Sequence, residues 1–221
     1  MLFTDYLYEN SKEIWDKYLE HPFLKEIGEG TLDKEKFRKY LIQDYLYLIE
    51  YAKVYAMACV KSRNLKELKM FNEGIAGSIE NETANHIMYL RDDFGENIDE
   101  IEYKYKLNLT NESYTSYMKS ISLTGTVEDI VAGVLPCTWS YGYIGLKLKE
   151  KYKDKLEGNF YKSWIETYAG DEYSKCTNEW IDFTNELCND LSDERKEQLK
   201  DIFVRASMYE LEFWNMAYKG E

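Results

Sequence analysis

The sequence predicts an all-helical protein. Apolar residues recur at spacings of three and four along the 221-residue chain, as in Leu41, Tyr45 and Leu48, and two-residue alternation is almost absent. Only 12 glycines and 2 prolines interrupt these runs, and neither a linker nor an internal repeat is evident. A chain of this length can bury a sizeable core, so we expect one helical-bundle domain spanning residues 1–221.

Punctuating residues set the expected helix boundaries. His21 and Pro22 end the first helix, because a proline ring clashes with the preceding helical turn. Gly95, Gly125 and Gly220 lie where a left-handed cap would end three later helices. The expected helices cover residues 5–20, 33–63, 65–94, 112–123, 127–152, 159–189 and 193–218, with a short turn at 23–27.

The helix expected over residues 127–152 has the clearest start, a capping box formed by Thr126 and Asp129. Pro136 lies inside this helix and cannot donate a hydrogen bond to the carbonyl of Ala132. We therefore expect a local kink.

Cys137 follows that proline in the stretch "VLPCTWSYGYIG" and shares a helix face with Tyr141, four residues later. Two interpretations stay open on this pattern. Cys137 either faces a pocket at the kink or is a buried, unreactive thiol.

A polar stripe of Tyr40, Asp44, Tyr47 and Tyr51 runs along the second long helix, which is apolar on most other sides. Asp44 is therefore expected to be buried, where its carboxylate needs a partner. That partner is either a ligand amine or the neighbouring tyrosine hydroxyls.

The last helix places Glu210, Phe213 and Trp214 on one face and directs Glu212 elsewhere. Glu210 is thus an acid on an aromatic face, suited to donate a proton, although an ordinary core stripe gives the same pattern. Tyr168 precedes an Ala-Gly break and can face a cavity.

Only two histidines occur, which limits metal chemistry. Glu82 and His86 have the four-residue spacing of half a metal site, but the rest of a ligand set is missing. A structural hydrogen bond is the favoured interpretation, and no metal is expected. His21, beside Pro22, is interpreted as a helix-end residue.

The charge balance excludes several partners. With 41 acidic against 28 basic residues the formal charge is -13, which disfavours nucleic acid and anionic membranes.

No run approaches about 20 apolar residues, and the amino terminus lacks the basic start of a signal peptide, so we expect a cytoplasmic protein. The four cysteines form no CxxC pair and are expected to be reduced thiols.

Five segments together resemble the thiaminase II (TenA) family of aminopyrimidine hydrolases. They are "HPFLKEIGEGTLDKEKFRKYLIQDYLYL", "ENETANH", "LPCTWSYGYIG", "WIETYAGDEY" and "YELEFWNMAY", in order along most of the chain. The resemblance favours a reactive Cys137 over an unreactive thiol.

The resemblance implies a haem-oxygenase-like helical fold, a homotetramer, and neither metal nor organic cofactor. It implies hydrolysis of 4-amino-5-aminomethyl-2-methylpyrimidine to the hydroxymethyl pyrimidine, and cleavage of thiamine. By motif, Cys137 is the nucleophile and Glu210 is the proton donor. Tyr47 matches the residue that increases the reactivity of the cysteine. The implied substrate contacts are Asp44, Tyr141, Tyr168, Tyr114 and Phe213.

Two positions depart from the family pattern, and two other functions stay open. Tyr143 replaces a common acidic residue and Gly170 a common serine, which puts the leaving-group preference in doubt. The first alternative is a haem- or metal-dependent oxidase on the same scaffold, with His21 binding iron. The second is a protein that binds aminopyrimidines without catalysis.

Overall fold

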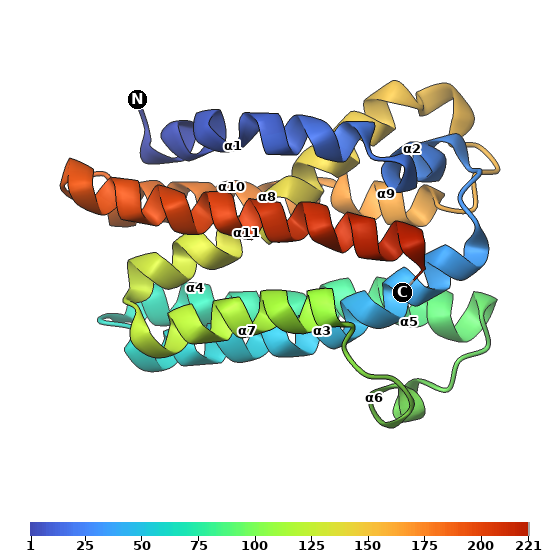
Figure 1. The fold of residues 1–221 in the computed structure, drawn as a ribbon, viewed down its shortest axis with the longest axis horizontal. Helices are drawn as coiled ribbons and strands as arrows, with labels where there is room; N and C mark the ends of the chain where they lie inside the picture. The colour runs from blue at the N-terminus through green and yellow to red at the C-terminus, as the bar shows by residue number, and fades with distance from the viewer. Residues whose placement is uncertain (221) are drawn as a thin grey trace. The chain divides into compact units, whose positions relative to one another are not determined.

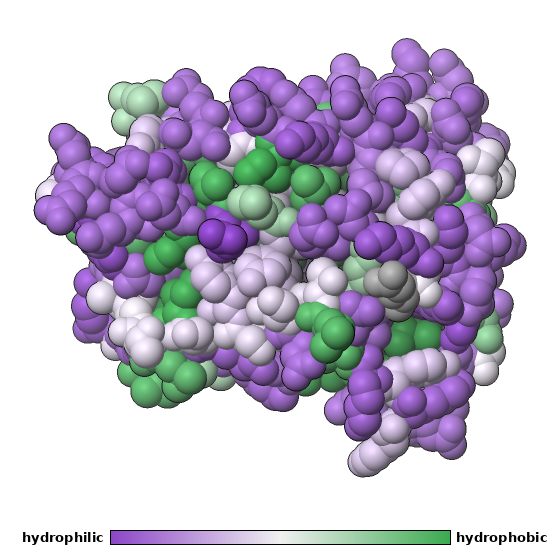
Figure 2. Space-filling view, in the orientation of Figure 1, coloured by the Kyte–Doolittle hydropathy of each residue, from purple (hydrophilic) through white to green (hydrophobic). Residues whose placement is uncertain are grey.

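The structure is a computed structural model that describes residues 1–220. Its regular secondary structure is helical (Figure 1). No strand occurs within that range, so the all-α prediction is confirmed. None of its helices is both long and apolar enough to cross a lipid bilayer. The face seen in Figure 2 is mostly hydrophilic, with smaller apolar areas.

The chain forms two compact units, which we describe separately. The first unit comprises residues 1–32 and 131–218. The second comprises residues 33–130 with the last residues of the chain. The prediction of a single domain stays a prediction.

The first unit packs the N-terminal helix of the chain against helices from its C-terminal half. Its N-terminal helix α1 lies along α10 and the long C-terminal helix α11 (Figure 1). Its helices are α1 (Phe3–Glu20), α2 (Pro22–Glu29), most of α8 (Val127–Lys151), α9 (Lys162–Tyr168), α10 (Asp171–Cys188) and α11 (Asp193–Lys219).

Aromatic rings fill the core where α1 meets α8 and α11. The Trp15 ring lies 5.2 Å from Trp139 and 6.1 Å from Phe203, centroid to centroid. The Trp15 indole N–H also donates to the Ser207 hydroxyl over 3.1 Å. Such rings bury large areas and fix the helices that carry them.

The second unit is built around α3 (Lys34–Lys61), which packs against α4 (Leu65–Ala76) and α7 (Leu109–Thr124). Asp33 caps α3 by accepting hydrogen bonds from the backbone N–H groups of Glu35 and Lys36. The other helical segments are the π-helical Gly77–Glu82, α5 (Thr83–Met88), the π-helical Tyr89–Asp93, the 3-10 helix Ile98–Glu100, α6 (Ile101–Lys104) and the first turn of α8.

Two predicted helices differ from the structure. The helix expected over residues 65–94 continues to Asp93, but two π-helical segments flank α5 and change the register of its side chains. The helix expected over residues 159–189 is two helices, because Gly170 adopts an extended conformation (φ −80°, ψ 158°) before α10.

The predicted boundaries are partly right. Gly95 and Gly220 adopt left-handed conformations, with φ of 66° and 71°. Gly125 does not: it is extended, and Asp129 accepts a hydrogen bond from the Thr126 N–H next to it. The turn after Pro22 is the eight-residue helix α2, and α6 was not predicted.

Gly145 allows α8 to approach the end of α9 closely. A Cβ at this position would lie 2.7 Å from the backbone carbon of Tyr168 and 2.8 Å from the nitrogen of Ala169. Backbone atoms cannot move aside as a flexible side chain can. Because Gly145 has no side chain, Tyr168 can lie directly against α8.

We predict that Gly145→Ala lowers the free energy of unfolding by about 1–3 kcal/mol, the usual cost of overpacking a core. Urea denaturation followed by circular dichroism measures it. Gly77→Ala is the matched control, because nothing lies within 4 Å of a Cβ there. A Gly145→Ala protein as stable as the control would contradict this account.

Candidate functional site

Cys137 and Tyr141 project from the same face of α8, as their spacing predicts. Both are buried, Cys137 with 4% of its surface exposed. The helix is continuous through Pro136. Among the four free cysteines, Cys176 on α10 is exposed, whereas Cys137 is enclosed by the first unit's core.

Glu210 lies on the buried face of α11 with 2% of its surface exposed, while Glu212 is exposed. The predicted helix face is therefore confirmed. Phe213 and Trp214 are buried beside it.

Tyr18 of α1 links these two residues. Burial raises the pKa of the Tyr18 phenol, and the charges of Glu210 and Cys137 raise it further. The Tyr18 hydroxyl donates to the carbonyl of Ser207 over 2.5 Å. The cysteine, the glutamate and this phenol are thus all buried in the first unit, and their charges influence one another.

A layer of aromatic rings adjoins Tyr141. Its ring centroid lies 4.8 Å from that of Tyr168 and 5.1 Å from that of Trp214. Trp164 packs 4.8 Å from Tyr168. The structure therefore brings together the predicted first-unit residues Tyr141 and Tyr168, with Trp164 as a member that the sequence did not identify.

Asp44 is buried on α3 of the second unit with 3% of its surface exposed, as the polar stripe predicts. Its Oδ2 accepts a hydrogen bond from the Tyr40 hydroxyl over 3.0 Å and lies 2.6 Å from Nε2 of His86. One of the two proposed partners, a tyrosine hydroxyl, is therefore present. The second hydrogen-bond partner that the protein supplies is the imidazole of His86.

His86 lies on α5 and is fully buried. Its Nδ1 lies 2.8 Å from the backbone carbonyl oxygen of Glu82, so the four-residue spacing reflects a hydrogen bond to the main chain. Burial lowers the pKa of His86, but the hydrogen bond and charge of Asp44 outweigh it and leave the pKa raised. The sequence interpretation of a structural hydrogen bond is correct, but it missed Asp44.

Tyr47 and Tyr114 lie together in the second unit. Their ring centroids are 5.4 Å apart, and Tyr47 also stacks on Tyr51 at 5.3 Å. The Tyr47 hydroxyl lies 3.9 Å from the Met118 sulfur. These three tyrosines therefore form part of the core of the second unit.

Tyr143, one of the two residues that differ from the family pattern, belongs to the aromatic core of the first unit. Its ring lies 5.5 Å from Trp15 and 6.2 Å from Tyr8. Burial and a hydrogen bond with Tyr8 raise the pKa of its phenol. Gly170, the other departure, begins α10 two residues after Tyr168.

His21 is a helix-end residue, as predicted. Its Nδ1 accepts from the backbone N–H of Phe23 over 3.2 Å, and Nε2 lies 3.2 Å from the Asn215 side-chain oxygen. Both ring nitrogens are thus engaged. Within residues 1–220, no group of three or more His, Cys, Asp or Glu side chains is arranged to hold a metal ion.

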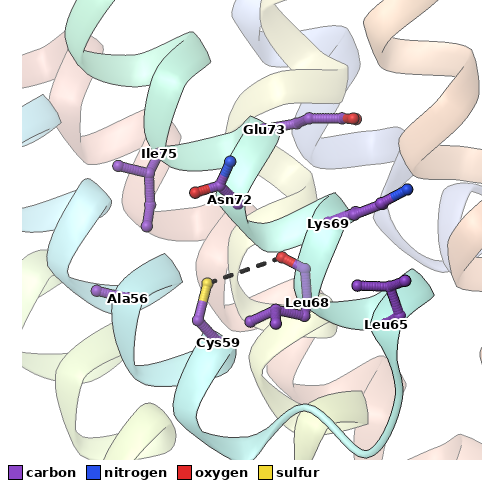
Figure 3. A pocket seen from close by; sticks show the side chains of 8 residues that line it. All are labelled: Ala56, Cys59, Leu65, Leu68, Lys69, Asn72, Glu73 and Ile75. Carbon is purple, nitrogen blue, oxygen red and sulfur yellow. Dashed lines mark hydrogen bonds between the residues drawn. The ribbon is translucent and has the colours of Figure 1, made fainter.

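A separate surface groove of about 630 Å³ lies where α3 meets α4 (Figure 3). Cys59 lies in it and approaches the carbonyl oxygen of Leu68 at 4.0 Å. Burial raises the pKa of the Cys59 thiol, which disfavours the nucleophilic thiolate. The groove contains none of the predicted site residues.

A family model described as the TENA/THI-4/PQQC family matches residues 8–220. The chain belongs to the TENA/THI-4/PQQC family. Among the family's curated members, the Helicobacter pylori "Aminopyrimidine aminohydrolase" is 39% identical over 224 residues, covering 100% of both chains.

Solved structures agree with this TENA/THI-4/PQQC assignment. The TenA homologue from P. horikoshii OT3 superposes with a TM-score of 0.87 at 27% identity, covering 100% of both chains. A domain of unknown function with a heme oxygenase-like fold from Shewanella denitrificans OS217 gives a TM-score of 0.73 at 16% identity, covering 98% of this chain and 92% of its own. The predicted haem-oxygenase-like fold is confirmed.

We predict that Tyr18→Phe lowers the free energy of unfolding by about 1 kcal/mol, because a buried hydrogen bond to Ser207 is lost. Tyr6→Phe is the control on the same helix: its hydroxyl bonds Glu197 at an exposed position, where such a bond contributes less. Thermal unfolding of both variants tests the difference. If both variants lost the same free energy of unfolding, the buried Tyr18 bond would contribute no more than the exposed Tyr6 bond, and the prediction would be wrong.

Proposed function

We propose that this chain is an aminopyrimidine aminohydrolase of thiamine salvage. The proposed reaction converts 4-amino-5-aminomethyl-2-methylpyrimidine to the hydroxymethyl pyrimidine with release of ammonia, and thiamine is a further proposed substrate. The observation that carries the proposal is the match, over the full length of both chains, to the Helicobacter pylori aminopyrimidine aminohydrolase. We also propose the homotetramer that the resemblance implies, with no metal or organic cofactor.

In the proposed mechanism, the Cys137 thiolate adds to an electron-poor ring carbon next to a ring nitrogen, and Glu210 protonates that nitrogen. The electron pair of the dearomatised ring then expels the protonated amino group of the aminomethyl arm as ammonia. Water adds at the methylene carbon left behind and gives up a proton, and expulsion of the Cys137 thiolate with return of the ring N–H proton to Glu210 restores the aromatic ring. Each step needs a nucleophile and an acid that are shielded from bulk water.

The first unit supports these two roles. Cys137 and Glu210 are both buried, and the charge of each acts on the Tyr18 phenol. A positioned carboxyl group can transfer a proton to a reacting ring. Tyr141 and Tyr168 offer flat aromatic faces, which suit contact with a pyrimidine.

The second unit supports a role for Asp44 in binding. Its buried carboxylate can accept a hydrogen bond from the amino group of the ring. As the resemblance implies, we propose that Tyr47 increases the reactivity of the cysteine and that Tyr114 and Phe213 contact the substrate.

The hydrogen bonds of His21 bear on the oxidase alternative. Because both of its ring nitrogens are engaged, iron binding would require breaking either the cap bond from Phe23 or the bond to Asn215. A non-catalytic aminopyrimidine-binding protein would use the same binding contacts. Turnover separates it from the enzyme.

We predict that Cys137→Ser abolishes most turnover of the aminomethyl pyrimidine but still binds it, because a hydroxyl is a far weaker nucleophile than a thiolate. Ammonia release measures turnover and calorimetry measures binding. Cys176→Ser, at an exposed position, is the control that should keep wild-type activity. Near-normal turnover by Cys137→Ser would remove covalent catalysis from the mechanism.

We predict that Glu210→Gln lowers kcat about a hundredfold or more, the usual scale for a general acid, and changes binding much less. The pH profile should lose the limb that belongs to this acid. Glu212→Gln is the matched control, because Glu212 is exposed on the same helix. If Glu212→Gln were the inactive variant instead, the proton-donor assignment would be wrong.

A further inference from the structure

We infer that His86 is a buried imidazolium ion that positions Asp44, so that one carboxylate oxygen is fixed by the protein and the other is presented to the ligand. The inference about charge stands on the geometry of the second unit alone. The inference about the ligand rests on the proposed function. His86 is a positioning residue, because it acts through Asp44.

The hydrogen bonds of His86 determine where its protons lie. A backbone carbonyl can only accept, so the nitrogen that faces the Glu82 carbonyl, Nδ1, must carry a proton. The 2.6 Å contact between Nε2 and Oδ2 of Asp44 also requires a proton, because two lone pairs would repel at that distance. The pair of side chains is therefore neutral as a whole.

The shared proton belongs to the imidazole. Oδ2 also accepts from the Tyr40 hydroxyl, and such a bond favours a carboxylate oxygen that carries negative charge. Imidazole is a stronger base than a carboxylate, and the Asp44 contact strengthens it further. His86 is thus positively charged and hydrogen-bonded through both ring nitrogens.

Both protein partners of Asp44 converge on the same oxygen. Tyr40 and His86 each bond Oδ2, so the protein holds this oxygen from two sides. Because a carboxylate group is planar, holding Oδ2 also sets the direction of Oδ1. Oδ1 can accept one N–H of an aromatic amino group.

The backbone around His86 is also unusual. The helix α5 has a π-helical segment on each side, and the Thr83 hydroxyl donates to the Ser78 carbonyl over 2.6 Å at the first of them. Segments of this kind rotate the side chains that follow and occur often at functional sites. Here they set the register in which His86 meets Asp44 on α3.

The charge of His86 can be tested in the resting protein by nuclear magnetic resonance with 15N-labelled histidine. The chain has only two histidines, so His21→Asn assigns both signals. At pH 8 an ordinary histidine is neutral, whereas we expect both nitrogens of His86 to be protonated, and Asp44→Asn to abolish that state. A neutral His86 at pH 8 in the wild-type protein would overturn the inference.

The positioning role is tested by His86→Gln, whose amide can still donate to Asp44 but carries no charge. We expect KM for the aminomethyl pyrimidine to rise about tenfold with a smaller change in kcat, since a charge-assisted hydrogen bond is lost. For an analogue that lacks the ring amino group, wild type and His86→Gln should bind equally. His21→Asn is the control that should match wild type with both compounds.

The outcomes separate the two proposals. If wild type does not turn over the aminomethyl pyrimidine, the proposed function fails, and the resonance measurement still decides the charge of His86. If wild type is active and His86→Gln weakens both compounds to the same degree, His86 is structural and the positioning role is wrong.

Discussion

Polar groups that are buried inside helical protein need partners there, and this requirement shapes the interior of both units. In the first unit, Ser207 receives a hydrogen bond from Trp15 on its hydroxyl and another from Tyr18 on its carbonyl. In the second, Asp44 receives bonds from Tyr40 and His86. A tyrosine serves this purpose well, because its ring packs like an apolar side chain while its hydroxyl bonds a buried acceptor.

The helix faces could be predicted because one helix determines them. The 3.6-residue period places Asp44 and Glu210 inside and Glu212 outside without any knowledge of neighbouring helices. The same reasoning placed Cys137 with Tyr141. Residue type added the rest, since buried acids and a thiol beside aromatic rings are unusual enough to stand out.

The partners could not be predicted, because they come from distant parts of the chain. His86 meets Asp44 across 42 positions, and Tyr18 meets Ser207 across 189. The spacing of Glu82 and His86 suggested a local pair, and the bond to the backbone carbonyl satisfies that spacing without revealing the second partner. The π-helical segments have no comparable sequence signal, because they add residues to a turn without breaking the helix.

The make-up of the first unit has a consequence for synthesis. The second unit is almost one continuous stretch and can assemble as soon as residue 130 has left the ribosome, whereas the first needs both residues 1–32 and 131–218. The Trp15 ring of α1 therefore stays without its α11 partner Phe203 until translation is nearly complete. Contacts so distant in sequence form slowly. The nascent N-terminal helix thus exposes apolar surface during most of synthesis, a condition that favours aggregation.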